Sequence, residues 1–248
     1  MCWHSTEACR LMRLVLRPGT VLRVLIGLSV ALVAIHTVML LAAYAVGRTG
    51  MGPIAGAVNL AIDSAVPTWF ASAILAAAGI LGFALASRTD GKADRLAWIG
   101  LGILGFLLSI DEVATIHERW GDIASGTPLS SDALGYSWVL GGLVFAGLVA
   151  VLYLPFLIRL DARTRWLLIA AGVVFLAGAV GVEIVNGTTP LADGDGGRAL
   201  LQHLLVAGVE EFLEFIGASL LVYALMDALA GPTGMVTVVV DRNEHTAP

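Results

Sequence analysis

The chain has 248 residues, of which 58% are hydrophobic and 13% are charged, and its formal net charge is −5. This composition excludes a soluble globular domain, in which about 25% of residues are charged. The acidic balance, without a basic patch, also excludes a nucleic-acid-binding protein. The sequence therefore predicts a protein whose main partner is the lipid bilayer.

Six apolar stretches are long enough to cross a hydrocarbon core of about 30 Å as helices. Backbone groups in lipid must pair internally, and none of the stretches alternates apolar with polar residues as a barrel strand would. We therefore predict an all-α polytopic membrane protein, a six-transmembrane-helix bundle. The predicted spans are Val21–Val46, Thr68–Ser87, Leu96–Glu118, Trp138–Leu160, Trp166–Gly187 and Ala199–Leu229.

Basic residues predict the orientation of these spans. One set of segments, which includes both termini and two short loops, holds eleven of the fourteen basic residues, and the other set holds three. The positive-inside rule then places both termini in the cytoplasm. Thirteen of the basic residues are arginines, which suggests a high-GC bacterial genome and hence a bacterial inner membrane. The predicted domains are a cytoplasmic segment 1–20, a transmembrane domain 21–230 and a cytoplasmic tail 231–248.

Two segments outside the spans have patterns of their own. Residues 47–67 have partial helical apolar spacing, which suggests an interfacial helix or a re-entrant piece. The tail after Gly231 includes "MVTVVV", which is compatible with a short strand or with a disordered segment.

Ionisable residues inside the spans are the most informative feature, because they are costly in lipid and usually mark function. In the predicted topology they all lie between the membrane midplane and the outer surface. They are His36 in the first span, Asp111, Glu112, His117 and Glu118 in the third, Glu183 with Asn186 in the fifth, and His203, Glu210, Glu211 and Glu214 in the sixth.

Helical phase groups some of these side chains. On the sixth span His203, Glu210 and Glu214 fall within about 40° of one another. On the third span Asp111 and Glu118 share a face, whereas Glu112 and especially His117 point elsewhere. His36 is most simply a core histidine bonded to a neighbour.

Energetics argue against exposing the three glutamates of the sixth span to lipid. Three ionised acids cost roughly 8–10 kcal/mol at the bilayer centre, and the apolar residues of this span return about 4–9 kcal/mol. The acids should therefore face the bundle, be protonated or hold a cation. An excess of carboxylates and imidazoles over lysine and arginine is typical of a site for a metal ion or for exchangeable protons.

Three classes of function fit these residues. Because they differ in this respect, whether the protein is an enzyme stays open. The first is a metal-dependent enzyme acting on a lipid or lipid-linked substrate. It would hold a divalent ion of the zinc or iron class, with Glu118 or Glu211 as general base. The second is a proton- or cation-coupled transporter, against which stand the lack of an internal repeat and of a clearly broken helix. The third is a structural or accessory subunit. The predicted metal ligands are Asp111, His117, Glu183, His203, Glu210 and Glu214.

Three patches, "NLAIDSAVPTWFAS", "LSIDEVATIHE" and "VEEFLE", resemble a group of bacterial polytopic membrane proteins of unknown activity. The resemblance covers about residues 55–225 and implies a shared architecture and a common site. The chain is also similar, more distantly, to membrane hydrolases of the ceramidase and progestin-receptor type, which implies a zinc site. It lacks the paired-histidine motif that those hydrolases carry on the last helix.

Overall fold

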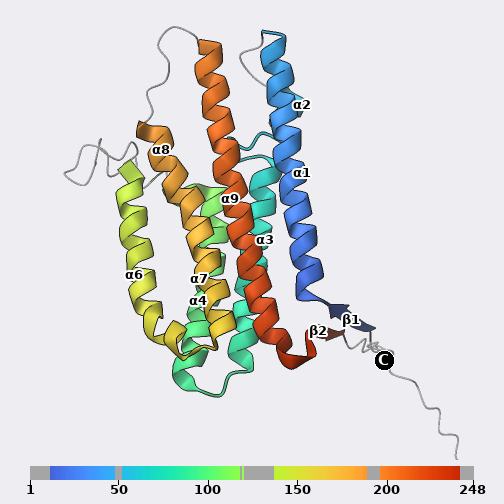
Figure 1. The fold of residues 1–248 in the computed structure, drawn as a ribbon, viewed down its shortest axis with the longest axis vertical. Coiled ribbons are helices and arrows are strands. Elements are labelled where there is room, and N and C mark those ends of the chain that lie inside the picture. The colour runs from blue at the N-terminus through green and yellow to red at the C-terminus, as the bar shows by residue number, and fades with distance from the viewer. Residues whose placement is uncertain (1–11, 48–51, 118, 120–136, 189–195, 241–248) are drawn as a thin grey trace, which may run out of the picture.

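The structure is a computed structural model that describes residues 12–47, 52–117, 119, 137–188 and 196–240. Within these residues, six helices are long and apolar enough to cross a membrane, and they form one elongated bundle (Figure 1). The predicted all-α fold with six spans is confirmed. The six candidate spans are Pro18–Ala45, Val66–Ser87, Lys92–Ala114, Trp138–Arg159, Ala162–Val185 and Leu201–Thr233.

The elements follow the predicted order, with small differences at the ends. The helices are α1 (Pro18–Ala45), α2 (Gly52–Gly56), α3 (Val66–Ser87), α4 (Lys92–Ala114), α6 (Ser137–Arg159), α7 (Ala162–Leu176), α8 (Glu183–Thr188) and α9 (Gly196–Ala230). A π-helical segment, η2 (Ala177–Val182), joins α7 to α8, and a 3₁₀ turn, η3 (Gly231–Thr233), follows α9. Helices α1 and α3 both have proline in their first turn, where the missing N–H costs no hydrogen bond.

Helices α3 and α4 form the most extensive helix–helix contact among the described residues, and glycines make this contact possible. A Cβ added at Gly82 would lie 2.7 Å from the backbone nitrogen of Gly102, and one added at Gly105 would lie 2.7 Å from that of Gly79. Lipid gives helices no hydrophobic reason to associate, so close backbone packing of this kind is a main source of stability.

Helix α9 is the central element, because it lies against α1, α3 and α7 (Figure 1). Its Phe215 is fully buried and makes an edge-to-face contact with Phe70 of α3, with ring centroids 5.3 Å apart. Helix α6 is peripheral and holds to the bundle through Phe156, whose ring lies 4.8 Å from that of Trp98 on α4.

A two-stranded antiparallel sheet lies beside the lower ends of α1 and α9 (Figure 1). Strand β1 (Met12–Leu16) pairs with β2 (Val236–Val240), so that Leu16 lies opposite Val236. The strand in the tail agrees with one of the two predicted options. Its partner in the N-terminal segment was not predicted, because the pairing joins opposite ends of the chain.

The segment between α1 and α3, expected to be an interfacial helix or a re-entrant piece, contains little helix among its described residues. Its helix α2 has only 5 residues, and turns follow it. These turns are held by hydrogen bonds such as that from the Val66 N–H to the Ala57 carbonyl, at 2.9 Å. The described part of this segment is therefore mostly a loop, held by hydrogen bonds between its turns.

His36 fastens this loop to two helices. Its ring is completely buried in α1, its Nδ1 accepts a hydrogen bond from the Leu60 N–H at 3.2 Å, and its Nε2 lies 3.2 Å from the Leu204 carbonyl oxygen of α9. Because Nδ1 accepts a hydrogen bond, the ring proton is on Nε2, which donates a hydrogen bond to the Leu204 carbonyl. The imidazole is therefore neutral, and the interpretation of His36 as a bonded core histidine is confirmed.

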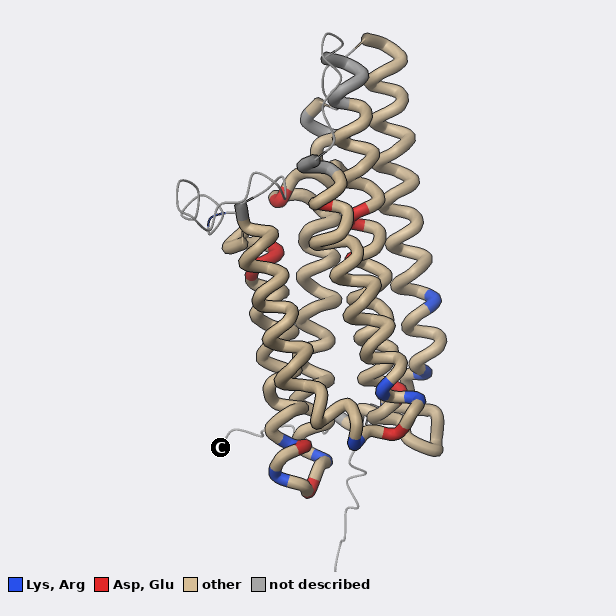
Figure 2. The backbone as a smooth tube through the Cα atoms, turned by 60° about the vertical axis from the view of Figure 1, so that its left-hand side comes forward, with Lys and Arg blue, Asp and Glu red and all other residues tan. Residues whose placement is uncertain are grey.

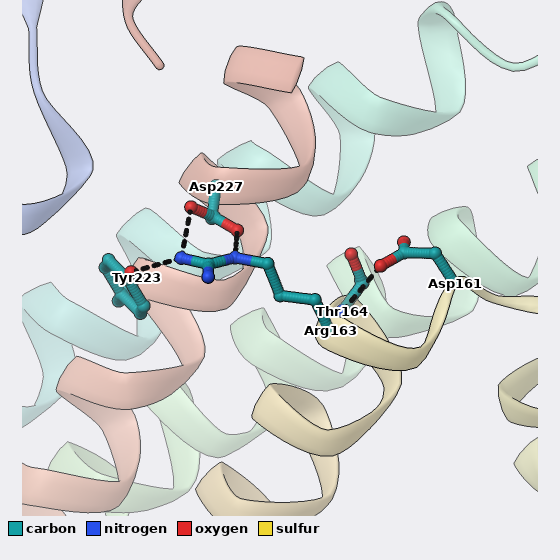
Figure 3. Close-up of polar contacts among 5 residues, drawn as sticks. All are labelled: Asp161, Arg163, Thr164, Tyr223 and Asp227. Atoms are coloured by element: carbon teal, nitrogen blue, oxygen red, sulfur yellow. Dashed lines mark hydrogen bonds and ion pairs between the residues drawn. The ribbon is translucent and has the colours of Figure 1, made fainter. Parts of the chain in front are cut away.

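Helix α7 begins with a side-chain cap. Asp161 lies between the two neighbouring spans, and its Oδ1 accepts a hydrogen bond from the Thr164 N–H at 3.0 Å (Figure 3). The hydrogen bonds from Thr164 lower the pKa of the Asp161 carboxyl below its ordinary value of 3.8. The cap thus stabilises the folded protein when Asp161 is ionised.

We predict that Asp161→Ala lowers the free energy of unfolding by about 1 kcal/mol at neutral pH, as loss of an N-cap usually does. The lowered pKa means that this stability is present above the ordinary value of 3.8 and is lost as the pH falls through the folded-state value. Thermal unfolding of both proteins in detergent across this range tests it. Asp161→Asn is the control, because asparagine caps equally well without titrating. A difference between wild type and Ala that does not shrink in acid would contradict the mechanism.

Candidate functional site

Acidic residues lie at two levels of the bundle, and most of the described lysine and arginine residues share only the lower one (Figure 2). Figure 2 shows lysine and arginine gathered mainly at the lower end of the bundle, and a group of acidic residues well above them, beside the upper ends of the shorter helices. The acidic group combines residues from α4, α8 and α9. Glu112 of α4 and Glu183 of α8 both interact electrostatically with glutamates of α9, so the grouping is a product of the fold.

The end of α4 turns two of the predicted residues toward each other. Thr115 has a left-handed backbone with φ 48°, which is unfavourable for a β-branched residue and ends the helix after Ala114. The chain then folds back, so that Asp111 accepts hydrogen bonds from the His117 N–H and from the His117 ring, each at 2.9 Å. The expectation that His117 points away from Asp111 is wrong, because it assumed a continuous helix.

The π-helical segment brings Glu183 to α9. A Cβ added at Gly178 in this segment would lie 2.7 Å from the Glu210 carbonyl oxygen, so the two backbones are in close contact. Glu183 directly follows the π-helical segment, and its carboxyl interacts with the Glu210 carboxyl. Isolated π turns often occur at functional sites, because they re-aim a side chain without ending the helix.

Trp138, at the start of α6, links the two parts of the site. Its Nε1 donates a hydrogen bond to the Glu183 carboxylate at 3.4 Å. Its ring also makes an edge-to-face contact with the ring of His117, with centroids 4.7 Å apart. Helix α6 thus contributes a neutral donor to the site while it contacts the turn after α4.

Five glutamates form what we call the carboxyl cluster. The charge of Glu214 interacts with those of four other glutamates, and Glu211 interacts with Glu112 and Glu210. All five side chains are half-buried. The carboxyl cluster consists of Glu112, Glu183, Glu210, Glu211 and Glu214.

The carboxyl cluster has little compensation from basic groups. Among the described residues, the ion pairs of lysine and arginine are Arg159 with Asp94 and Arg163 with Asp227, both at the opposite end of the bundle. Within the same part of the chain, the Glu211 Oε2 is buried without a hydrogen-bond partner. Such an oxygen is costly unless a proton or a cation satisfies it.

The structure brings together some of the predicted site residues and separates others. Glu183, Glu210, Glu211 and Glu214 lie together, and Asp111 pairs with His117 beside them. His203 lies two turns before Glu210 on the same helix, which is about 10 Å along the axis. Glu118 lies outside the described residues, and the side chain of Asn186 is likewise not described.

A metal centre of the predicted kind is not found among the described residues. No group of three or more His, Cys, Asp or Glu side chains in this part of the chain is arranged to hold one metal ion. The proposed set of Asp111, His203, Glu210 and Glu214 spans too much of α9, since Glu214 lies eleven residues, or about 16 Å, beyond His203. The divalent ion of the zinc or iron class stays a prediction.

Two acidic residues in the site were not among the predicted ligands. Glu112 belongs to the carboxyl cluster, and Asp63, in the loop before α3, interacts electrostatically with Glu112 and Glu211. Glu112 was set aside on helical phase, and Asp63 lies outside the predicted spans. The acidic pair Asp111-Glu112 beside a predicted acidic helix was the available signal for Glu112, whereas nothing in the sequence places Asp63.

Comparison with known proteins gives a family without an assigned activity. A family model described as "Domain of unknown function (DUF8692)" matches residues 24–229. The chain belongs to this family. The DUF8692 match runs from α1 to the end of α9 and so includes the whole carboxyl cluster. No curated protein and no solved structure matches the chain.

Proposed function

We propose that this DUF8692 protein binds and releases protons at the carboxyl cluster as part of proton-coupled transport across the membrane. The observation that carries the proposal is the contact between the carboxyls of Glu183 and Glu210 inside a group of five glutamates. The polytopic membrane architecture provides the setting, because a proton site within a span is useful mainly to a protein that moves charge or solute.

The electrostatic argument is that neighbouring carboxyls cannot all be ionised away from water. Two like charges about 5 Å apart repel by roughly 3 kcal/mol at an effective dielectric constant of about 20. Each member of the carboxyl cluster interacts electrostatically with at least two of the others. The group therefore retains protons that belong to the group rather than to one residue, and changes in hydration or geometry change how many it holds.

The irregular fifth span supports transport more than the sequence did. A clearly broken helix was missing from the sequence pattern, and this counted against a transporter. The π-helical segment Ala177–Val182 is an irregularity within a continuous span and not a break, and it lies directly before Glu183. A π turn is a place where a helix changes register at small cost, so a shift there would move Glu183 relative to Glu210.

A route for protons from water is available at the turn after α4. The side chains of Asp111 and His117 are 29% and 37% exposed, and they lie beside Glu112 of the carboxyl cluster. An imidazole hydrogen-bonded to a carboxylate is a common proton shuttle. In this proposal His117 and Asp111 exchange protons with water, and Glu112 passes them to Glu211.

A bound divalent cation is the second candidate, favoured by the unpartnered Glu211 Oε2. A cation held by carboxylate oxygens would satisfy that atom and offset the repulsion within the carboxyl cluster. Metal-dependent hydrolysis of a lipid-like substrate, with Glu118 or Glu211 as general base, stays a prediction. In this case the glutamates would be ionised, which separates the two candidates.

The test combines infrared spectroscopy with elemental analysis of the detergent-purified protein. We expect carbonyl bands of protonated carboxylic acids at neutral pH, which shift in D₂O and disappear as the pH is raised. Elemental analysis should find no metal bound at a ratio of one ion per chain. Proteoliposomes under an imposed pH gradient should acidify internally faster than protein-free vesicles, as followed with a trapped pH-sensitive dye.

Other outcomes would contradict the proposal. Ionised carboxyls at neutral pH together with one bound metal ion per chain would favour the cation site. Protonated carboxyls that neither titrate nor exchange with D₂O would favour a structural role, in which the glutamates only join helices.

A further inference from the structure

A second polar site lies at the opposite end of the bundle. We call it the basic pocket: a cavity of about 270 Å³ between the start of α1, the end of α9 and the turn before β2. Its polar lining comes from Arg17, Thr20, Arg23, Tyr223 and Asp227. It shares no residue with the carboxyl cluster, so ligand binding in the basic pocket does not depend on the proposed function.

Two exposed arginines give the basic pocket its charge. Arg17 directly precedes α1, and Arg23 lies in its second turn. The Nε of Arg23 donates to the Gly19 carbonyl at 3.1 Å and its Nη2 lies 3.4 Å from the Thr20 hydroxyl, which hold the guanidinium along the first turn of the helix. Both arginines line the same cavity.

Asp227 is the acidic residue in the lining, and its charge is already matched. Arg163 of α7 binds it through two hydrogen bonds, from Nε to Oδ2 at 2.7 Å and from Nη2 to Oδ1 at 3.2 Å (Figure 3). This forked pairing occupies both carboxylate oxygens and offsets their repulsion of an anion. The basic pocket thus keeps the positive charge of Arg17 and Arg23.

The same arginine orients a neutral donor. The Nη2 of Arg163 donates to the Tyr223 hydroxyl at 2.9 Å, so the oxygen of Tyr223 is an acceptor in this contact (Figure 3). The hydroxyl proton of Tyr223 then remains for another acceptor. Two guanidinium groups and one hydroxyl around a small cavity are a donor set suited to a phosphate.

We propose that the basic pocket binds the phosphate of an anionic phospholipid headgroup. The cavity lies at the ends of the spans α1 and α9, where headgroups meet the protein, and basic pockets between transmembrane helices are known to take such headgroups. The apolar residues that follow on α1, including Val24 and Leu28, are 56% and 48% exposed and provide a surface for an acyl chain. This surface distinguishes a lipid from a free phosphate ion.

Native mass spectrometry of the delipidated full chain with added phosphatidylglycerol tests the proposal. We expect the lipid to bind wild type at least about tenfold more tightly than it binds Arg17→Gln/Arg23→Gln, since each hydrogen bond to a charged group contributes appreciably to affinity. The matched control is Arg95→Gln/Arg165→Gln, which removes the same charge from the same end of the bundle but outside the basic pocket. It should bind like wild type.

Two further arms make the result decisive. Arg17→Gln alone changes an exposed residue before the helix. This variant should bind the lipid more weakly than wild type and should unfold at the same temperature as wild type. Inorganic phosphate and glycerol phosphate should compete poorly, because they lack acyl chains. Equal binding by the pocket and control variants would overturn the proposal, and so would competition by inorganic phosphate at the lipid's own concentration.

Discussion

Replacing Glu210 with glutamine should abolish most of the proton exchange of this protein while leaving its fold intact. Glutamine keeps the size of a protonated glutamate and can still hydrogen-bond to Glu183, but it does not titrate. Positioned proton-transfer groups contribute about 10²–10⁴-fold where they act, so we expect dye-detected proton flux in proteoliposomes to fall by at least about tenfold. The infrared bands of protonated carboxyls should also lose intensity.

The stability of Glu210→Gln separates the two candidate functions. If the carboxyl cluster holds protons, the substitution removes a source of repulsion, and the unfolding temperature should stay the same or rise. If it holds a cation, the variant loses a charged ligand, and both bound metal and stability should fall.

Asp90→Asn is the matched control, because it neutralises an exposed acid in the loop between α3 and α4, at the far end of the bundle. It should exchange protons like wild type. Equal flux in Glu210→Gln and wild type would remove Glu210 from the proton pathway.

A methyl group added at Gly217 should be among the most damaging small changes in the bundle. A Cβ there would lie 2.5 Å from the backbone nitrogen of Phe175 and 2.6 Å from its Cα, so α7 and α9 would have to move apart. Overpacking of this kind typically costs about 1–3 kcal/mol. Because the contact is with backbone, no side-chain rotation relieves it, and we expect Gly217→Ala to reach the upper part of that range.

The control is the same exchange where space is open. Gly172 lies in α7, and a Cβ added there meets nothing within 4 Å. Gly172→Ala should be neutral or stabilise the protein by up to about 1 kcal/mol, because alanine is the better helix former. Unfolding in mixed micelles by a denaturing detergent measures both changes. Similar stability of the two variants would show that α7 and α9 are not held at the distance described.

Gly217 also connects stability to the site, because it lies three residues after Glu214 on α9 and packs against α7 just before the π-helical segment. Moving α7 away from α9 would change the separation of Glu183 and Glu210. We therefore expect Gly217→Ala to impair proton exchange as well, although it removes no titratable group.

The sequence alone determined that this is a polytopic membrane protein and that acidic residues of the sixth span belong to its candidate site. Stretches of about 20 apolar residues predict spans because the energy of transfer into lipid depends on local composition. The acids of the sixth span were visible for the same reason, since each is costly in lipid wherever its neighbours lie. The structure moved the span boundaries by a few residues, as with α1, which begins at Pro18 and not at Val21.

Only the tertiary structure decided which of these acids meet. Glu112 and Asp63 join the site, and His203 lies apart from Glu214, because helix ends and helix contacts set these positions. The left-handed Thr115 and the π-helical segment each break the regular helical phase on which the sequence argument relied. Such irregularities persist because packing against other helices holds them, as Gly178 against α9 shows. Contacts between residues far apart in the chain leave no periodic pattern in the sequence, so the pairing of Glu183 with Glu210 required the fold.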